Sequence, residues 1–221
     1  MPQAVRVWDL PTRLFHWALV AVVLGLFATA YLPGSWIVWH SRLGFAVLAL
    51  VLFRVVWGFA GGRWSRFSAF FYAPRSVLAY LRGQAHPDHL VGHHPLGAAS
   101  VLAMLALLLA QAGSGLFTDD EIAFTGPLNR FVSSASGLTA TWYHKDLGQW
   151  LLVALVVLHM AAVLYYLVGK KDDLIGPMIG GDKLLEAPVA PSRDDLRSRL
   201  GALLLMGLCA GLVYLVVNLG A

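Results

Sequence analysis

The chain has 221 residues, of which 58% are hydrophobic and only 13% are charged. A soluble domain typically carries about 25% charged residues, so the composition excludes an ordinary soluble domain and indicates an integral membrane protein. The formal net charge is +4, but the basic residues border apolar runs, which is typical of membrane topology and not of a nucleic-acid groove. We therefore expect membrane lipid as the surroundings and no nucleic-acid partner.

Five apolar stretches have about the 20 residues that a helix needs to cross a bilayer. The predicted spans are about 14–32, 40–60, 96–117, 144–168 and 200–219. The predicted fold class is all-α, an integral membrane helical bundle. Residues 1–183 are expected to form a transmembrane domain with a four-helix core, and residues 184–221 a linker and a fifth, C-terminal transmembrane helix.

Two connections between the spans are informative. The basic, aromatic segment 61–95 ends with the histidines His86, His89, His93 and His94. Their spacing fits either a zinc site or solvated loop histidines, and both interpretations stay open. The loop 118–143 carries Asp119-Asp120-Glu121, which we interpret as a solvated segment or as a surface for a partner protein.

The basic residues predict the orientation of the chain. Thirteen of the sixteen lysines and arginines fall in residues 1–13, 54–95 and 169–199, and only Arg42, Arg130 and Lys145 fall on the opposite side. Because positive residues stay in the cytoplasm, we expect the N-terminus inside and the C-terminus outside.

Four histidines lie in or beside the predicted spans, and their depths pair them. In this orientation His40 and His144 lie at the outer ends of spans two and four, whereas His16 and His159 lie toward the cytoplasm. Ionisable side chains inside a membrane are costly and are therefore usually functional. Paired imidazoles from facing helices are how a bundle holds a b-type haem. The sequence thus predicts two haem sites, one near each side of the membrane.

Three further residues fit such sites. Gly44 follows His40 by four residues, and Gly148 likewise follows His144. Each glycine is one turn further on the same helix face, where it would leave room for a flat macrocycle; close helix packing is the alternative. Arg54 is about 21 Å deeper than His40, where a haem propionate could balance its charge; snorkelling to the cytoplasmic interface is the alternative.

Other functional classes stay open at this point. The histidines could relay protons in a proton or solute transporter, although the sequence shows no inverted repeat and no broken helix at mid-membrane. The chain could also be a membrane anchor of a redox complex, in which the histidines would be dispensable. Cys209 is the only cysteine and no Cys-x-x-Cys-His motif is present, so any haem would be held non-covalently.

Several motifs between residues 5 and 183 belong to a known pattern. The most specific is Arg6-Val-Trp-Asp-Leu-Pro-Thr-Arg-Leu-Phe-His16-Trp. The others are Phe53-Arg-Val-Val-Trp-Gly58, Arg66-Phe67, Gly92-His93-His94-Pro95-Leu96-Gly97, Asp119-Asp-Glu-Ile-Ala-Phe-Thr-Gly-Pro-Leu128, His159 and Leu164-Tyr-Tyr166. Together they resemble the bacterial di-haem cytochromes b, the superfamily of the b-type cytochrome subunit of nickel–iron hydrogenases and bacterial cytochrome b561.

The chain departs from this family at two places. The third-span motif reads His93-His94-Pro95, whereas the family has His-Asn-Pro. The spacing of fifteen residues between His144 and His159 is about one residue longer than the family's, and a bulge in the helix would absorb the difference.

The resemblance implies two non-covalent b haems, with His16, His40, His144 and His159 as the iron ligands. It implies electron transfer in the bacterial inner membrane between the quinone pool and a periplasmic redox partner, namely a c-type cytochrome, a hydrogenase or a similar subunit. No catalytic residue is assigned, and a quinone oxidoreductase activity stays open, as does self-association. The quinone is expected either at the cytoplasmic rim, with Arg6, Arg13, Arg66 and His93, or at the outer face near Tyr143.

Overall fold

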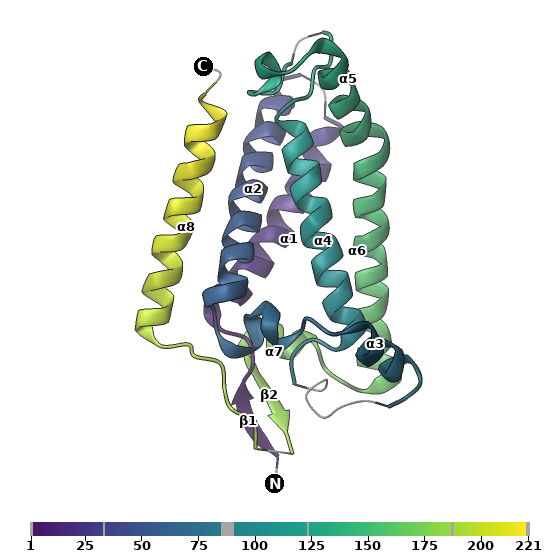
Figure 1. The fold of residues 1–221 in the computed structure, drawn as a ribbon, viewed down its shortest axis with the longest axis vertical. Coiled ribbons are helices and arrows are strands. Elements are labelled where there is room, and N and C mark those ends of the chain that lie inside the picture. The colour runs from purple at the N-terminus through teal and green to yellow at the C-terminus, as the bar shows by residue number, and fades with distance from the viewer. Residues whose placement is uncertain (1, 33, 85–90, 123, 187, 220–221) are drawn as a thin grey trace. The chain divides into compact units, whose positions relative to one another are not determined.

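The computed structural model describes residues 2–32, 34–84, 91–122, 124–186 and 188–219 of the chain, and long helices dominate it (Figure 1). The α-helices are α1 (Leu10–Ala30), α2 (Trp36–Ala60), α3 (Pro74–Leu81), α4 (Pro95–Gly115), α5 (Ser134–Trp142), α6 (Gln149–Leu164), α7 (Ile175–Gly180) and α8 (Leu196–Val217). The two strands are β1 (Gln3–Arg6) and β2 (Asp182–Leu185). Short 3₁₀ turns cover Arg63–Ser65, Phe67–Ala69 and Asn129–Phe131.

Among the described residues, five helical runs are long and apolar enough to cross a membrane. They are α1, α2, α4, α8 and the continuous run Ser134–Lys170. In that run, π-helical turns at Tyr143–Gly148 and Tyr165–Lys170 flank α6. These five runs confirm the number of predicted spans, while the orientation of the termini stays a prediction.

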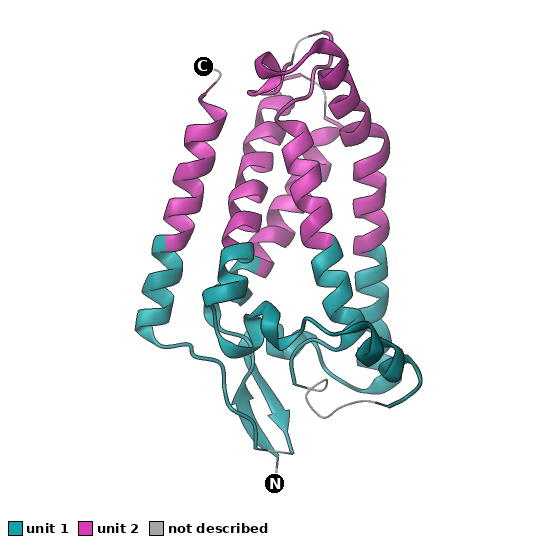
Figure 2. Cartoon of the chain, in the orientation of Figure 1, with its two compact units in different colours: residues 1–15, 54–103, 157–204 teal, residues 16–53, 104–156, 205–221 magenta. Residues whose placement is uncertain are grey.

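The chain divides into two compact units (Figure 2). Unit 1 comprises Met1–Phe15, Arg54–Ala103 and Val157–Leu204. Unit 2 comprises His16–Phe53, Met104–Val156 and Leu205–Ala221. The boundaries fall inside the long helices, so each unit contains a part of every spanning helix.

In unit 1 the N-terminal segment is held by residues from near the other end of the chain. Strand β1 pairs antiparallel with β2, with Arg6 opposite Asp182. Ser192 then donates from its backbone N to Arg6 O and from its hydroxyl to Val7 O, both at 2.7 Å. The all-α prediction missed this small sheet, because the strands have only four residues each and pair across most of the sequence.

Asp9, which is fully buried, organises the entry to α1. Its Oδ1 accepts the Thr12 N–H at 2.8 Å and so caps the helix. Its Oδ2 accepts the Gly62 N–H at 2.8 Å and the Ser65 hydroxyl at 2.9 Å, and the indole N–H of Trp57 lies 3.3 Å from both oxygens. A buried carboxylate is stable only when it is well hydrogen-bonded. This cap also explains why α1 starts at Leu10, before the apolar run that predicted a span from about residue 14.

The core of unit 2 includes the fifth spanning helix. Leu48 and Ala49 of α2 pack with Leu116 and with Val213 of α8. Other apolar residues on this part of α8 are exposed, including Leu208 and Leu215. An exposed apolar face on a spanning helix is suited to contact with lipid.

Candidate functional site

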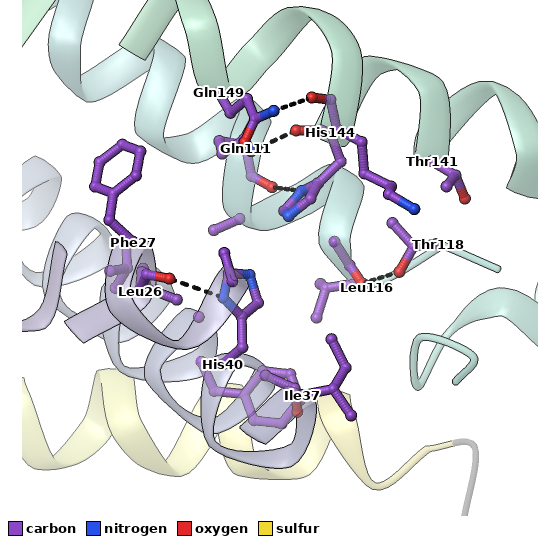
Figure 3. A pocket seen from close by; sticks show the side chains of 18 of the residues that line it. Leu26, Phe27, Ile37, His40, Gln111, Leu116, Thr118, Thr141, His144 and Gln149 are labelled. Atoms are coloured by element: carbon purple, nitrogen blue, oxygen red, sulfur yellow. Dashed lines mark hydrogen bonds between the residues drawn. The ribbon is translucent and has the colours of Figure 1, made fainter. Parts of the chain in front are cut away.

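Unit 2 contains a cavity of about 350 Å³, within the range of about 300–1,000 Å³ that small-molecule and cofactor sites occupy. Its wall is formed by helices α1, α2 and α4, by the run Ser134–Lys170, and by the loop residues Thr118, Asp120, Phe124 and Pro127. Most of the lining side chains are apolar, among them Phe27, Phe45 and Leu108. His40 of α2 and His144 of the first π-turn both line this cavity (Figure 3).

The rings of these two histidines lie close together but do not stack. Their centroids are 6.1 Å apart and their planes cross at 83°. The sequence predicted this pair from depth alone, and the structure brings the two residues together.

Each of the two rings is oriented by a backbone carbonyl. The Nδ1 atom of His40 lies 3.1 Å from Leu26 O, and the Nδ1 atom of His144 lies 2.9 Å from Gln111 O. A carbonyl oxygen can only accept a hydrogen bond, so Nδ1 carries the proton in both rings. The Nε2 atom of each neutral ring therefore keeps a lone pair that can bind a metal.

This arrangement fits a b-type haem. Histidines that bind metals almost always donate their other ring N–H to a carbonyl, a carboxylate or water, as His40 and His144 do. An imidazole nitrogen binds a transition metal at about 2.0–2.1 Å, so two imidazoles on opposite sides of one ion have centroids about 6 Å apart. The centroid distance and the protonation pattern thus both suit residues that would hold the iron of a haem.

The π-turn that carries His144 is the bulge expected from the long spacing to His159. Gln111 of α4 stabilises it, because its side-chain N–H donates to His144 O at 2.9 Å while its own carbonyl accepts from His144 Nδ1. A Cβ at Gly148 would collide with the Gln111 amide oxygen and would lie 2.9 Å from the Tyr143 ring. The structure therefore gives Gly148 a packing role beside Gln111, and its contact with a macrocycle stays a prediction.

Gly44 behaves differently from Gly148. It lines the cavity, and a Cβ built on it would meet nothing within 4 Å. This open space beside His40 is what a flat ligand close to the backbone requires. The role of Gly44 toward a haem is a prediction that the geometry supports.

The two histidines of the predicted inner pair belong to different units. His16 lies on α1 in unit 2, where its ring contacts the edge of Trp17, and His159 lies on α6 in unit 1. Their pairing stays a prediction.

Three further predicted cofactor residues lie in unit 1 and share one property. Arg13 Nε, Arg54 Nη1 and His93 Nδ1 are buried without a hydrogen-bond partner in the described structure. The Arg54 side chain is only 2% exposed, and its guanidinium lies over the rings of Phe67 and Phe70 at 5.3 and 5.9 Å. Buried polar atoms normally have partners, so these positions suit an anionic or carbonyl-bearing ligand.

His93 and His94 have distinct surroundings. His93 packs between Trp8 and Phe70, at 4.7 and 4.5 Å between ring centroids. Burial, and then the charge of Arg54, lower the pKa of His93 to about 3, so the ring is neutral at physiological pH. His94 stacks on Tyr166, with centroids 4.2 Å apart and planes at 12°. Tyr80 donates or accepts a 2.5 Å hydrogen bond at the Tyr166 hydroxyl.

The proposed zinc alternative is only partly covered by the structure. His86 and His89 lie outside the described residues. Among the described residues, no group of three or more His, Cys, Asp or Glu side chains is placed to hold a metal ion.

Sequence reasoning missed the residues that orient the two cavity histidines. Gln111 is a polar residue in the otherwise apolar α4, and Thr29 and Ser114 are hydroxyl residues close to helix ends. A polar side chain within a spanning helix is a signal of function or of interhelical hydrogen bonding, and this signal was present for Gln111.

Comparison with known proteins agrees with this site. The family model of prokaryotic cytochrome b561 matches residues 7–181. The chain belongs to this family. A b-type cytochrome carries haem b and transfers electrons, and the five spanning runs make this member a multi-pass membrane protein. The resemblance seen in the sequence motifs is thereby confirmed.

Named relatives of this cytochrome b561 family member are hydrogenase-associated. The chain is 27% identical over 219 residues to the probable Ni/Fe-hydrogenase B-type cytochrome subunit of Azotobacter vinelandii, covering 83% of this chain and 90% of that protein. It is 22% identical over 211 residues to the probable Ni/Fe-hydrogenase 1 B-type cytochrome subunit of Escherichia coli K12, covering 79% and 88%. No solved structure matches the chain.

Proposed function

We propose that this cytochrome carries electrons across the bacterial inner membrane through two b haems, between a periplasmic redox partner and the quinone pool. His40 and His144 hold the outer haem, and His16 and His159 hold the inner one. The N-terminus lies in the cytoplasm and the C-terminus outside. The relatives' names favour a nickel–iron hydrogenase as the partner.

The observation that carries this proposal is the protonation pattern of His40 and His144. Both rings donate from Nδ1 to a backbone carbonyl and border one largely apolar cavity. A proton relay would need imidazoles that exchange protons at both nitrogens, whereas fixed Nδ1–H groups leave Nε2 as a permanent lone-pair donor. The pair is therefore suited to hold iron.

The residues of the cavity perform three tasks. The Leu26 and Gln111 carbonyls fix the rings, the apolar lining excludes water, and the open space beside Gly44 admits the macrocycle. A bound b haem supplies reversible one-electron chemistry. The potential of that couple depends on axial ligands, their hydrogen bonds and burial.

The unpartnered donors of unit 1 support a second haem on the cytoplasmic side. Arg54 carries a buried positive charge that a propionate would neutralise. His93 and Arg13 each offer a further buried nitrogen, which suits either the second propionate or a quinone carbonyl. A quinone at this rim is the arrangement that we favour over one near Tyr143, because the orphaned donors lie here.

The partner is expected to dock on the loop 118–143. Thr118, Asp120, Phe124 and Pro127 of this loop line the cavity of His40 and His144, so a protein bound there would be close to the outer haem. Ile122 beside the acidic residues is 92% exposed, which suits a contact with another protein.

Transmembrane electron flow can be tested in liposomes that contain the haem-loaded protein and trapped ferricyanide. A membrane-impermeant reductant added outside is expected to reduce the trapped ferricyanide faster than in protein-free liposomes. The His40→Ala variant should abolish the acceleration. Equal rates with and without wild-type protein would contradict the proposal and favour an anchor, and pH-driven uptake by haem-free liposomes would favour a transporter.

A further inference from the structure

The Nδ1 atoms of His40 and His144 each face a backbone carbonyl with a hydroxyl side chain beside it, on two different helices. On α1, the accepting carbonyl belongs to Leu26, and the hydroxyl of Thr29 lies three residues further on. On α4, the accepting carbonyl belongs to Gln111, and the hydroxyl of Ser114 again lies three residues further on. One helix turn therefore presents a carbonyl and a hydroxyl to each ring.

The hydroxyl competes with the imidazole for the carbonyl. Ser114 Oγ donates to Gln111 O at 2.9 Å, the same distance as from His144 Nδ1 to that oxygen. Ser114 Oγ lies 3.3 Å from His144 Nδ1, farther than the Gln111 carbonyl at 2.9 Å, so the carbonyl is the main acceptor of this N–H. The Gln111 carbonyl that accepts the Nδ1 proton of His144 therefore also accepts the hydroxyl proton of Ser114.

The arrangement at His40 is similar but weaker. Thr29 Oγ1 lies 3.2 Å from Leu26 O but only 2.7 Å from Gly25 O, so its proton is drawn mainly to Gly25. Its oxygen lies 3.4 Å from His40 Nδ1. The competition for the Leu26 carbonyl is therefore smaller than the competition that Ser114 exerts at Gln111.

Hydrogen bonding at Nδ1 controls how strongly an imidazole donates electrons to a metal. A stronger N–H···O bond makes the ring more basic, and a more basic ligand stabilises the oxidised iron and lowers its reduction potential. A hydroxyl that weakens the bond has the opposite effect on the potential.

We propose that Ser114, and to a smaller degree Thr29, are positioning residues that raise the reduction potential of the outer haem by sharing the carbonyl that each axial histidine uses. This inference rests on the proposed function, because it requires a haem between His40 and His144. It assigns a role to two hydroxyls that touch neither iron nor substrate.

The test is a spectroscopic redox titration of the purified, haem-loaded protein. Ser114→Ala is expected to shift one of the two haem transitions to lower potential, Thr29→Val to shift the same transition less, and the double variant to shift it most. The other transition should stay unchanged. Ser114→Thr and Thr29→Ser, which keep the hydroxyl, should restore the wild-type potential.

Thr139→Val is the matched control, because the Thr139 hydroxyl donates to a carbonyl of its own helix, Ala135 O at 2.8 Å, and this carbonyl is not one that His40 or His144 uses. It should leave both potentials unchanged. Unchanged or raised potentials in Ser114→Ala, at full haem content, would overturn the inference. If the His40→Ala variant keeps both haems, both the proposed function and this inference are wrong. If that variant loses one haem but Ser114→Ala shifts no potential, only this inference is wrong.

Discussion

The imidazole rings of His40 and His144 lie 6.1 Å apart and cross at 83°, although they come from helical runs about 100 residues apart in the chain. Separate carbonyls fix each ring, at Leu26 and at Gln111. Two independently held metal-binding nitrogens in one apolar cavity form a preorganised site, because the rings need no reorientation when a ligand enters.

Gly148→Ala is expected to disturb the π-turn through Gln111. The new methyl group would occupy the position of the Gln111 amide oxygen, so the amide must move and lose its bond to His144 O. Overpacking of this kind typically costs about 1–3 kcal/mol. Thermal unfolding in detergent should show the loss, together with lower occupancy of one haem.

A control and a double variant make this test specific. Gly207→Ala adds the same methyl group on α8, where nothing lies within 4 Å, so it should lower neither quantity, and the higher helix propensity of alanine should stabilise the helix by up to about 1 kcal/mol. Gln111→Ala combined with Gly148→Ala removes the collision, so the two effects should not add. Strict additivity would contradict the assigned contact.

Asp9→Asn is expected to destabilise the whole protein. The amide keeps one acceptor oxygen, so donors among Thr12 N, Gly62 N, the Ser65 hydroxyl and the Trp57 indole would be left unsatisfied, at about 1–3 kcal/mol each. Asp173→Asn is the control, since that exposed carboxylate accepts two hydrogen bonds from described residues, the Ile175 and Gly176 amides. Equal melting temperatures of the two variants would refute the role of Asp9.

Asp194 links the starts of α1 and α8 and should make stability depend on acidic pH. It accepts from Leu10 N at 3.0 Å and pairs with Arg199 at 3.1 Å and Arg6 at 3.3 Å. Partial burial alone would raise its pKa, but the bonds from Arg199 and Leu10 and the charges of both arginines lower that pKa below the usual 3.8. The carboxylate therefore stabilises the fold above about pH 4, and this contribution is lost as the pH falls through the folded-state pKa.

Asp194→Asn should accordingly lower the melting temperature at pH 7, and the difference from the wild type should shrink as the pH falls from about 4 toward 3. Melting curves of both proteins across that range measure the difference. A gap that stays constant down to pH 3 would show that the ionised carboxylate does not contribute.

Arg54→Gln is expected to weaken the binding of one haem. The variant removes the buried charge that the proposed propionate neutralises, and loss of such a supporting group typically costs about 10- to 100-fold in affinity. Haem titration of the apoprotein should show one weakened site. Arg63→Gln, which removes a charge lying over Trp64, is the control, and identical titrations for the two variants would argue against Arg54 as a haem contact.

Much of the architecture could be predicted because a membrane imposes simple rules. The length of the apolar stretches predicted the five spans. The depth of the histidines within these spans predicted that His40 and His144 form a pair. The spacing to His159 indicated a bulge, and the π-turn Tyr143–Gly148 supplies it. The spans follow from local sequence, the depths from the distribution of basic residues, and the bulge from the spacing expected in the family that the motifs resemble.

Other features depend on contacts between distant segments, which a single sequence does not encode visibly. The sheet joins Gln3–Arg6 to Asp182–Leu185. The carboxylate of Asp9 accepts hydrogen bonds from residues between 57 and 65. The role of Gly148 was predicted from its position after His144, but its neighbour Gln111 comes from another helix. The carbonyls that fix the histidines are backbone atoms, so no side-chain pattern could reveal them.

The number of haems bound per chain tests whether His40 and His144 together hold one of two haems. Pyridine haemochrome analysis of purified protein, referred to protein mass, should give about two b haems per chain for the wild type and one for His40→Ala and for His144→Ala. Trp39→Ala, which changes a residue adjacent to His40 that does not line the cavity, should keep two. Two haems in both histidine variants, at wild-type folding, would contradict the claim.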